Sequence, residues 1–353
     1  MDPSSLTALG LSPFFLQQLD LAAGEAGRVA RVTAVHRGQI EVLGPAGTMR
    51  VPPFRPDLDP VDQATVGDWV VLSRSEGRPP ERLLDRQSLF KRRAAGAESR
   101  VQLIAANVDT VFITSSCNLD FNPARLERYL AVVHEAGALP VIVLTKADLA
   151  ADPDDFRTRA QAVARGALVE TVNALWGADV ARLAQWAGPG ETVAFMGSSG
   201  VGKSTLINTL RGNAEQVTRA IREDDAHGRH TTTARGLFRL ASGGWLIDTP
   251  GMREIQLAEA AEGIDAAFDD VTTLAAGCRF NDCRHEGEPG CAVAAAVADG
   301  TLDPARVTRW RKLRREEARN TASLAERRAF FRERGKLYRK IQGEKDARRD
   351  RDG

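Results

Sequence analysis

The chain has 353 residues, 43% of them apolar and 27% charged, with a formal net charge of +1 at pH 7. This composition is ordinary for a soluble protein with a sizeable core, and the length allows two or three domains. Apolar runs such as VIVL and CAVAAAVA are far shorter than the ~20 residues that cross a bilayer, and the N-terminus lacks the pattern of a secretory signal. We therefore expect a cytoplasmic protein with no membrane partner.

Charge is unevenly distributed along the chain. Residues 301–353 carry 18 Lys and Arg against 9 Asp and Glu, so the first 300 residues have a net charge of −8. A basic C-terminal segment on a mildly acidic body favours an anionic partner such as nucleic acid. A solvated helical face would have the same composition.

Short β-strands are predicted near the N-terminus, after an N-terminal extension (1–27) with a brief helical pattern. Five strand-like runs, RVARVTAVH, QIEVL, TMRVPP, GDWVVLSR and PERLLDR, follow within residues 28–90. Such strands, separated by turn residues, indicate a small antiparallel barrel, for which an OB-fold is the natural candidate. An SH3-like barrel would give a similar pattern. The polar, basic residues 91–100 are typical of a linker.

Strands alternating with helices are predicted over residues 101–257. The runs DTVFITSS and LPVIVLTK are continuously apolar, as in parallel strands that are buried on both faces. Four more runs, LVETVNA, ETVAFMGSS, RGLFRL and GWLIDTP, complete the pattern of a doubly wound α/β domain of P-loop type. Residues 258–340 give a helical pattern with clustered cysteines, and residues 341–353 that of a disordered basic tail.

A phosphate-binding loop is encoded by GSSGVGKS, which fits the pattern Gly-x-x-x-x-Gly-Lys-[Ser/Thr]. It lies between a predicted strand and a predicted helix, so its backbone N–H groups and the helix N-terminus can face phosphates. Lys203 would neutralise β- and γ-phosphate oxygens, and Ser204 would bind magnesium. The nucleotide-binding residues expected here are Gly197, Ser198, Ser199, Gly200, Val201, Gly202, Lys203, Ser204 and Thr205.

Two further motifs follow the loop at the spacing of GTPase switches. LIDTPG ends a predicted strand with Asp248, whose carboxylate can reach magnesium, and Gly251 would offer its N–H to the γ-phosphate. In GRHTTT, a hydroxyl of Thr231 or Thr232 would complete the magnesium shell only while the γ-phosphate is present. Both threonines remain candidates for this ligand.

A guanine-recognition signature, TKAD, precedes the phosphate loop instead of following it. The Asp148 carboxylate can accept two hydrogen bonds from guanine, whereas adenine presents a lone pair at the same place. All parts of a GTPase are present in the order guanine, phosphate, switches, which predicts a circularly permuted domain whose natural ends lie close together. The guanine contacts expected are Thr145, Lys146, Ala147, Asp148, Asn173 and Ala174.

The segment CRFNDCRHEGEPGC places three cysteines and one histidine within fourteen residues. The spacing Cys-x4-Cys-x-His-x5-Cys suits a closed, tetrahedral zinc site of the structural kind. The predicted ligands are Cys278, Cys283, His285 and Cys291. Cys117, at the end of a predicted strand, is expected to be a core thiol.

Together these motifs resemble the circularly permuted GTPases of bacteria that depend on the small ribosomal subunit. The resemblance covers nearly the whole chain, through NVDTVFI, LTKADL, GSSGVGKSTLIN, GRHTTT, DTPGMRE and CRFNDCRHEGEPGCAV. It implies a multidomain α/β protein with an N-terminal OB-fold β-barrel, a circularly permuted P-loop GTPase domain and a C-terminal helical zinc-binding domain. It also implies late maturation of the small ribosomal subunit, with contacts to its rRNA, one structural Zn²⁺, and Mg²⁺ bound with GTP.

Some positions depart from the usual GTPase pattern. Thr145 stands where most GTPases carry Asn, which removes an amide that braces guanine and the phosphate loop, and Asn173 replaces the commoner Ser. Met252 follows DTPG, where many GTPases carry a Gln that positions water, and an apolar side chain cannot do so.

His230 is the obvious substitute for that Gln, because an imidazole in the switch segment can hydrogen-bond an attacking water. Its alternative role is to hold the switch loop in place. The catalytic candidates are thus His230, Lys203 and Thr232. We expect slow intrinsic turnover that depends on the partner.

The motifs favour a GTPase, and the resemblance implies that it binds the small subunit in its GTP state and is released on hydrolysis to GDP; we expect a monomer. A GTP-gated RNA-binding module with incidental hydrolysis would carry the same motifs. A P-loop kinase is a third hypothesis, against which the TKAD signature argues.

Overall fold

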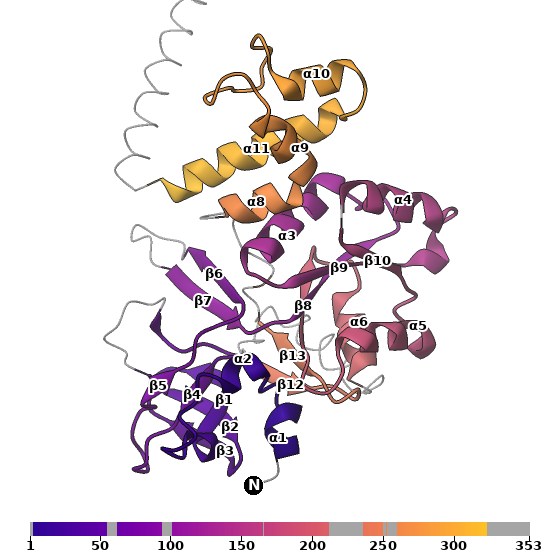
Figure 1. Ribbon diagram of the computed structural model, residues 1–353. Helices are drawn as coiled ribbons and strands as arrows, with labels where there is room; N and C mark the ends of the chain where they lie inside the picture. The colour runs from indigo at the N-terminus through magenta and orange to yellow at the C-terminus, as the bar shows by residue number, and fades with distance from the viewer. Residues whose placement is uncertain are drawn as a thin grey trace, which may run out of the picture.

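The computed structural model describes residues 3–54, 62–93, 101–164, 166–211, 236–249, 252 and 260–322. Three units are stacked in space: N-terminal strands and helices, a central α/β unit, and C-terminal helices at the far end (Figure 1). Among the described residues, no helix is both long and apolar enough to cross a membrane.

The N-terminal strands form an antiparallel sheet around β1. One edge of β1 pairs with β2, and the other edge pairs with β4 through residues 29–31. A register shift between Val32 and Ala34 bends β1. All five predicted strands are present, and the OB-fold assignment stays a prediction. Their bounds are β1 (Val29–His36), β2 (Gln39–Gly44), β3 (Gly47–Val51), β4 (Trp69–Val71) and β5 (Arg82–Leu83).

Two short helices, α1 (Pro3–Ala8) and α2 (Pro13–Leu16), pack on this sheet, followed by a 3-10 turn over Glu25–Gly27. Phe15 of α2 lies against Trp69 of β4, with ring centroids 5.9 Å apart. Val29 of β1 and Val71 of β4 are fully buried beneath the same helices. The predicted helical pattern of the N-terminal extension is therefore explained by packing on the strands.

The central unit is a mainly parallel sheet in the order β10-β9-β8-β11-β13-β12, in which only β12 is antiparallel to its neighbour. All six predicted strands are found. Their side chains alternate between two buried clusters, one beneath α3 and α4 and the other beneath α5 and α6. The bounds are β8 (Thr110–Ser116), β9 (Leu139–Thr145), β10 (Leu168–Thr171), β11 (Thr192–Gly197), β12 (Gly236–Arg239) and β13 (Trp245–Asp248).

The helices of the central unit begin where the sequence provides caps. The Asn122 side chain accepts from the Arg125 N–H at the start of α3, and Asp152 caps α4 in the same way. Leu126, Leu130 and Val133 lie on one face of α3 at helical spacing, and all three are buried. The bounds are α3 (Pro123–Glu135), α4 (Pro153–Val163), α5 (Gly177–Ala181) and α6 (Lys203–Leu210), with 3-10 turns over Ala147–Leu149 and Arg182–Trp186.

The segment between the two units contains an antiparallel pair of strands, β6 (Leu89–Arg93) and β7 (Val101–Ala106). Residues 91–93 of the predicted linker therefore belong to β6, and residues 94–100 lie outside the described residues.

The C-terminal helices pack on α3 (Figure 1). A Cβ on Gly263 of α8 would lie 2.0 Å from the Ala131 carbonyl oxygen of α3, so a glycine is required for the two helices to approach this closely. The bounds are α8 (Ala261–Ala267), α9 (Asp269–Ala276), α10 (Ala292–Ala298) and α11 (Pro304–Thr321).

The N-terminal sheet and the central sheet are continuous. The edge of β1 that pairs with β4 also pairs with β12, at Ala34 and Gly236. This pairing joins the six central strands to β1, β2 and β3 in one path of nine strands. No sequence pattern predicts this pairing.

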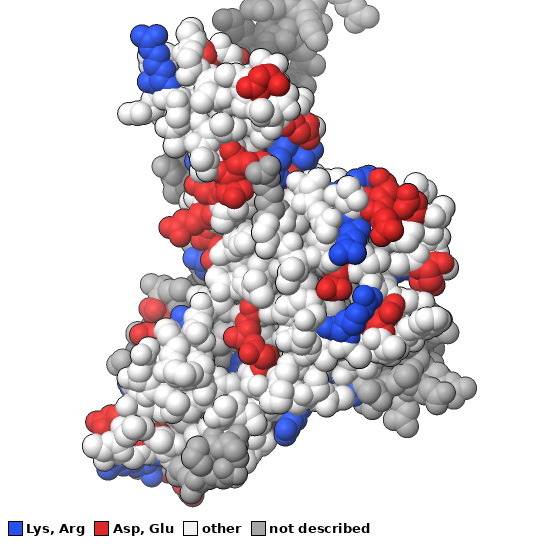
Figure 2. All heavy atoms as spheres, turned by 45° about the vertical axis from the view of Figure 1, so that its right-hand side comes forward, with Lys and Arg blue, Asp and Glu red and all other residues white. Residues whose placement is uncertain are grey.

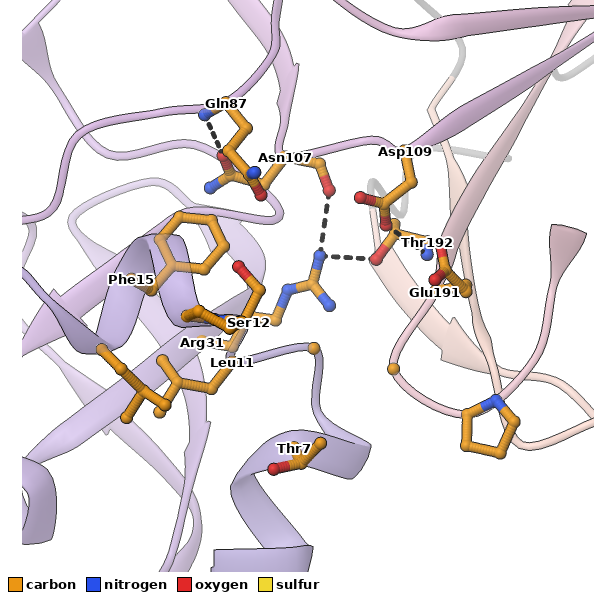
Figure 3. A pocket seen from close by; sticks show the side chains of 15 residues that line it. Thr7, Leu11, Ser12, Phe15, Arg31, Gln87, Asn107, Asp109, Glu191 and Thr192 are labelled. Carbon is orange, nitrogen blue, oxygen red and sulfur yellow. Dashed lines mark hydrogen bonds between the residues drawn. The ribbon is translucent and has the colours of Figure 1, made fainter.

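Arg31 of β1 fixes the same junction. Its guanidinium is buried and donates to the Thr192 hydroxyl at 2.7 Å, the Asn107 carbonyl at 3.2 Å and the Leu9 carbonyl at 2.6 Å. Burial lowers the pKa of Arg31 to about 10. Beside it lies a cavity of about 370 Å³ between α1, α2 and the ends of the central strands (Figure 3).

Candidate functional site

The phosphate loop lies between β11 and α6, as predicted. Gly197 has φ 143°, and a Cβ there would lie 2.3 Å from the Thr114 carbonyl oxygen of β8, so only glycine fits this turn. Lys203 is the first residue of α6 and is 4% exposed. Its Nζ donates to the Gly197 carbonyl at 2.8 Å and to the Ser198 carbonyl, so the ammonium is held over the loop.

The TKAD segment contacts this loop directly. The Thr145 hydroxyl, at the end of β9, donates to the Val201 carbonyl and lies 3.2 Å from the Ser115 carbonyl. Lys146 adopts a left-handed conformation with φ 58°, and its Nζ donates to the Gly200 carbonyl at 2.8 Å. The guanine signature and the phosphate loop thus form one structural unit, although the signature comes first in the chain.

Asp148 lies in the 3-10 turn that follows, and its side chain is exposed. Within the described part of the chain, no hydrogen bond or ion pair engages this carboxylate. It is therefore available to a ligand that offers two donors, which is the chemistry expected of guanine. Ala147 lies beside it at the start of the same turn.

The Asn173–Ala174 segment follows β10 at the same edge of the sheet. The Asn173 side chain accepts from the Leu175 N–H at 3.0 Å, and the Ala174 carbonyl accepts from the Thr209 hydroxyl of α6 at 3.0 Å. The Asn173 amide oxygen is used within its own turn, and the Asn173 carbonyl accepts from the Trp176 N–H. Within the described residues the Ala174 N–H has no hydrogen-bond partner, so it is the backbone group of this segment that remains to face guanine. Asp179 fixes the turn by accepting from the Asn173 N–H at 2.9 Å.

Asp248 ends β13 next to the phosphate-loop strand, and its carboxylate is half-buried. Ser204 is exposed in the first turn of α6. Met252 is buried at 2% exposure, so an apolar side chain fills the space after the DTPG motif. The predicted residues His230, Thr231, Thr232 and Gly251 lie outside the described residues.

A second site lies between α9 and α10. Cys278, Cys283, His285 and Cys291 bring their ligand atoms within 4.8 Å of one another. The Cys278 and Cys291 Sγ atoms are 3.9 Å apart, and their distances to His285 Nδ1 are 3.4 and 3.6 Å. Two thiolates about 2.3 Å from one tetrahedral ion would be about 3.8 Å apart, so this donor set fits a metal ion.

The surroundings of this cluster hold it in place. Cys291 caps α10 by accepting from the Ala294 N–H at 3.3 Å, and the His285 ring lies 5.3 Å from the Trp310 ring of α11. His285 has φ 60°, a left-handed conformation. Cys117 is not part of this cluster. It is 2% exposed, and burial raises the pKa of its thiol to about 11, as expected of a core thiol.

The basic C-terminal segment is only partly a surface feature. Arg306 of α11 is 4% exposed and donates to Glu127 of α3 at 3.0 Å and to Asp270 of α9 at 2.8 Å. Glu127 is itself fully buried and also accepts from Arg309 at 2.6 Å. No sequence pattern predicts this network, which attaches the C-terminal helices to the central unit. On the face shown in Figure 2, acidic and basic side chains are intermingled.

Comparison with known proteins agrees with this arrangement. The chain is 51% identical to the small ribosomal subunit biogenesis GTPase RsgA 2 of Vibrio parahaemolyticus, over 97% of this chain and 94% of the relative. It is 50% identical to the small ribosomal subunit biogenesis GTPase RsgA of Mesorhizobium japonicum, over 90% and 91%.

Two solved structures have the same fold. YjeQ from Thermotoga maritima superposes with a TM-score of 0.59 at 24% identity, covering 81% of this chain and 96% of that one. YloQ, described as a circularly permuted GTPase, gives 0.57 at 23% identity, covering 84% and 96%. The predicted permuted order is thereby confirmed. The family model described as RsgA GTPase matches residues 83–258, and with the relatives above it establishes that this chain belongs to the RsgA GTPase family.

Proposed function

We propose that this chain hydrolyses GTP to GDP and phosphate during late maturation of the small ribosomal subunit, to which it binds in its GTP state. The observation that carries the proposal is the contact of the guanine signature with the phosphate loop. Thr145 and Lys146 donate to the Val201 and Gly200 carbonyls, so the exposed carboxylate of Asp148 is held at a fixed place relative to Lys203. The names of the relatives supply the ribosomal partner.

The residues divide the task by their chemistry. Asp148 reads guanine, with the backbone of Asn173 and Ala174 behind the base, and Lys203 binds the β- and γ-phosphates. The magnesium ligands proposed are Ser204 and Asp248, together with Thr231 or Thr232, and Mg²⁺ would neutralise charge on the phosphates. His230 is proposed to orient the attacking water, because Met252 has no polar atom suited to that task.

The cluster of Cys278, Cys283, His285 and Cys291 is proposed to hold one structural Zn²⁺. Three thiolates and one imidazole fill a tetrahedral shell, which leaves no open position for chemistry. We also propose that residues 28–90 form an OB-fold barrel, that residues 101–257 and 258–340 are the GTPase and zinc-binding domains, and that the chain acts as a monomer with rRNA contacts.

A rate measurement tests the main proposal. Phosphate release from GTP is followed with added small subunits, large subunits or free RNA. Stimulation by the small subunit alone is expected, and Lys203→Ala and His230→Ala should each abolish it while His230→Ala retains nucleotide binding. Equal rates in all mixtures would favour the second candidate, a GTP-gated RNA-binding module with incidental hydrolysis. The observation that favours this candidate is Met252, which is buried and apolar and therefore cannot orient an attacking water.

A further inference from the structure

Arg125 connects α3 to the phosphate loop. It lies in the first turn of α3, and its Nη1 donates to both carboxylate oxygens of Asp120 at 3.0 Å and to the Ser198 hydroxyl. The carbonyl of the same Ser198 accepts from the Lys203 ammonium. Two cations from different helices therefore meet on one residue of the loop.

The guanidinium of Arg125 is only partly used by the protein. The three bonds above all involve Nη1, and the described part of the chain offers no partner to Nε or Nη2. The side chain is 36% exposed. A guanidinium has five N–H donors in a rigid fork that matches carboxylate and phosphate oxygens. Asp120 thus orients the group while N–H donors remain for a ligand.

We propose that Arg125 is a second cation of the phosphate site, and that its remaining N–H groups bind an oxygen of the terminal phosphate of GTP. This rests on the proposed function, because it assigns Arg125 a role in the same site. The Lys203 ammonium belongs to the β/γ end of the nucleotide, and Arg125 reaches the residue whose carbonyl that ammonium contacts. The ligand at this place is therefore the terminal phosphate and not the base.

The expected effect is on rate more than on affinity. During phosphoryl transfer, charge spreads over the oxygens of the transferred group, so a guanidinium fixed beside them stabilises the transition state more than bound GTP. Such a cation has particular value here because Met252, which follows the DTPG motif, is apolar. If Arg125 only braced the loop, its loss would weaken GDP and GTP binding alike and leave the chemical step unchanged.

Single-turnover hydrolysis at saturating GTP distinguishes these roles in the full chain. Arg125→Ala should lower the rate about 10²-fold, with GDP affinity unchanged, and Arg125→Lys should keep part of the rate. Added guanidinium at millimolar concentration should partly restore Arg125→Ala, which a loss of structure would not allow. Arg128→Ala is the matched control, because Arg128 lies on the same helix but pairs with Glu316 of α11; it should retain the wild-type rate and not respond to guanidinium.

Two results would overturn the assignment of Arg125. One is a wild-type rate in Arg125→Ala; the other is an equal loss of GDP and GTP-analogue affinity without rescue by guanidinium. A wild-type chain that neither binds nor hydrolyses GTP, indistinguishable from Lys203→Ala, would instead remove the proposed function itself. The two failures are thus separated by the wild-type measurement.

Discussion

At the scale of single residues, Thr145 shows how a departure from a motif can be compensated. The residue is fully buried, and its hydroxyl bonds to the Val201 carbonyl of the phosphate loop. A Cβ on Gly202 would lie 3.4 Å from the same hydroxyl, so the loop approaches β9 closely. A hydroxyl therefore braces the loop at the position where other GTPases use an amide.

Thr145→Val should weaken nucleotide binding. Valine has nearly the shape of threonine but no hydroxyl, so the Val201 carbonyl would lose a donor, at a cost of about 1–3 kcal/mol. Thr145→Ser keeps the hydroxyl and should bind nearly as the wild type does. Titration of a fluorescent GDP analogue measures both, and equal affinity of the valine variant would show that the bond does not support the site.

Asp148→Asn should reduce the preference for GTP over other purine nucleotides, because an amide cannot supply both acceptors to guanine. Asp155→Asn is the control, since Asp155 is exposed on α4 and pairs with Arg159. Competition binding with GTP, ITP and ATP gives the preference directly. An unchanged preference for GTP over ATP in Asp148→Asn would exclude Asp148 as the guanine reader.

At the scale of elements, the sequence predicts what depends on local pattern. Continuous apolar runs identify the six central strands, and motif residues fall at strand ends or helix starts because their chemistry needs those places. The pairing of β1 with β12 could not be predicted, since it joins segments about 200 residues apart through one register pair, Ala34 with Gly236. The burial of Arg306 could not be predicted either, because an arginine in a highly charged helix normally lies at the surface.

Arg306→Met should destabilise the attachment of the C-terminal helices strongly. It removes one partner from Glu127, which is fully buried, and one from Asp270, whose side chain is 9% exposed, and breaking a buried pair costs about 3–5 kcal/mol. In Arg314→Met the lost pair with Asp265 is exposed, so about 1 kcal/mol or less is expected. Urea unfolding of both variants gives the comparison, and equal midpoints would mean that burial adds nothing to this ion pair.

The cluster of Cys278, Cys283, His285 and Cys291 is an element-scale feature because it lies between α9 and α10. One zinc ion per chain is expected by elemental analysis, and chelation should loosen residues 278–322 first, since metal binding there stabilises the folded state. Hydrogen exchange locates the loosened region. Cys117→Ala should keep the full zinc content, whereas Cys278→Ala should lose it. A zinc-free protein with protected C-terminal helices would contradict the ligand assignment.

At the scale of the whole molecule, the excess of Lys and Arg over Asp and Glu in residues 301–353 is shared by two segments. Residues 301–322 carry 7 Lys and Arg against 3 Asp and Glu, and two of these arginines are committed to Glu127. Residues 323–353 carry 11 against 6. The larger net positive charge available to an anionic partner therefore belongs to the second part.

Association with small ribosomal subunits should be tighter with a non-hydrolysable GTP analogue than with GDP, because DTPG leads directly into the C-terminal region that follows it. It should also weaken as salt rises, through release of counterions. A chain ending at residue 322 should show a smaller salt dependence. Co-sedimentation at several salt concentrations tests both statements; equal binding in the two nucleotide states would show that the γ-phosphate does not control association.

The hydrogen bonds that join distant parts of the chain also affect the order in which the parts of the fold form during synthesis. The Trp245 indole donates to the Ala8 carbonyl, 237 residues earlier, and Arg31 reaches Thr192 across 161 residues. Contacts of such separation form late, because a long loop must close before they contribute. The N-terminal helices can thus pack on their own strands early, because that cluster lies within residues 6–84, but α1 gains its bond to β13 only after that strand has been synthesised. The junction between the N-terminal and central units is therefore among the last parts of the molecule to form.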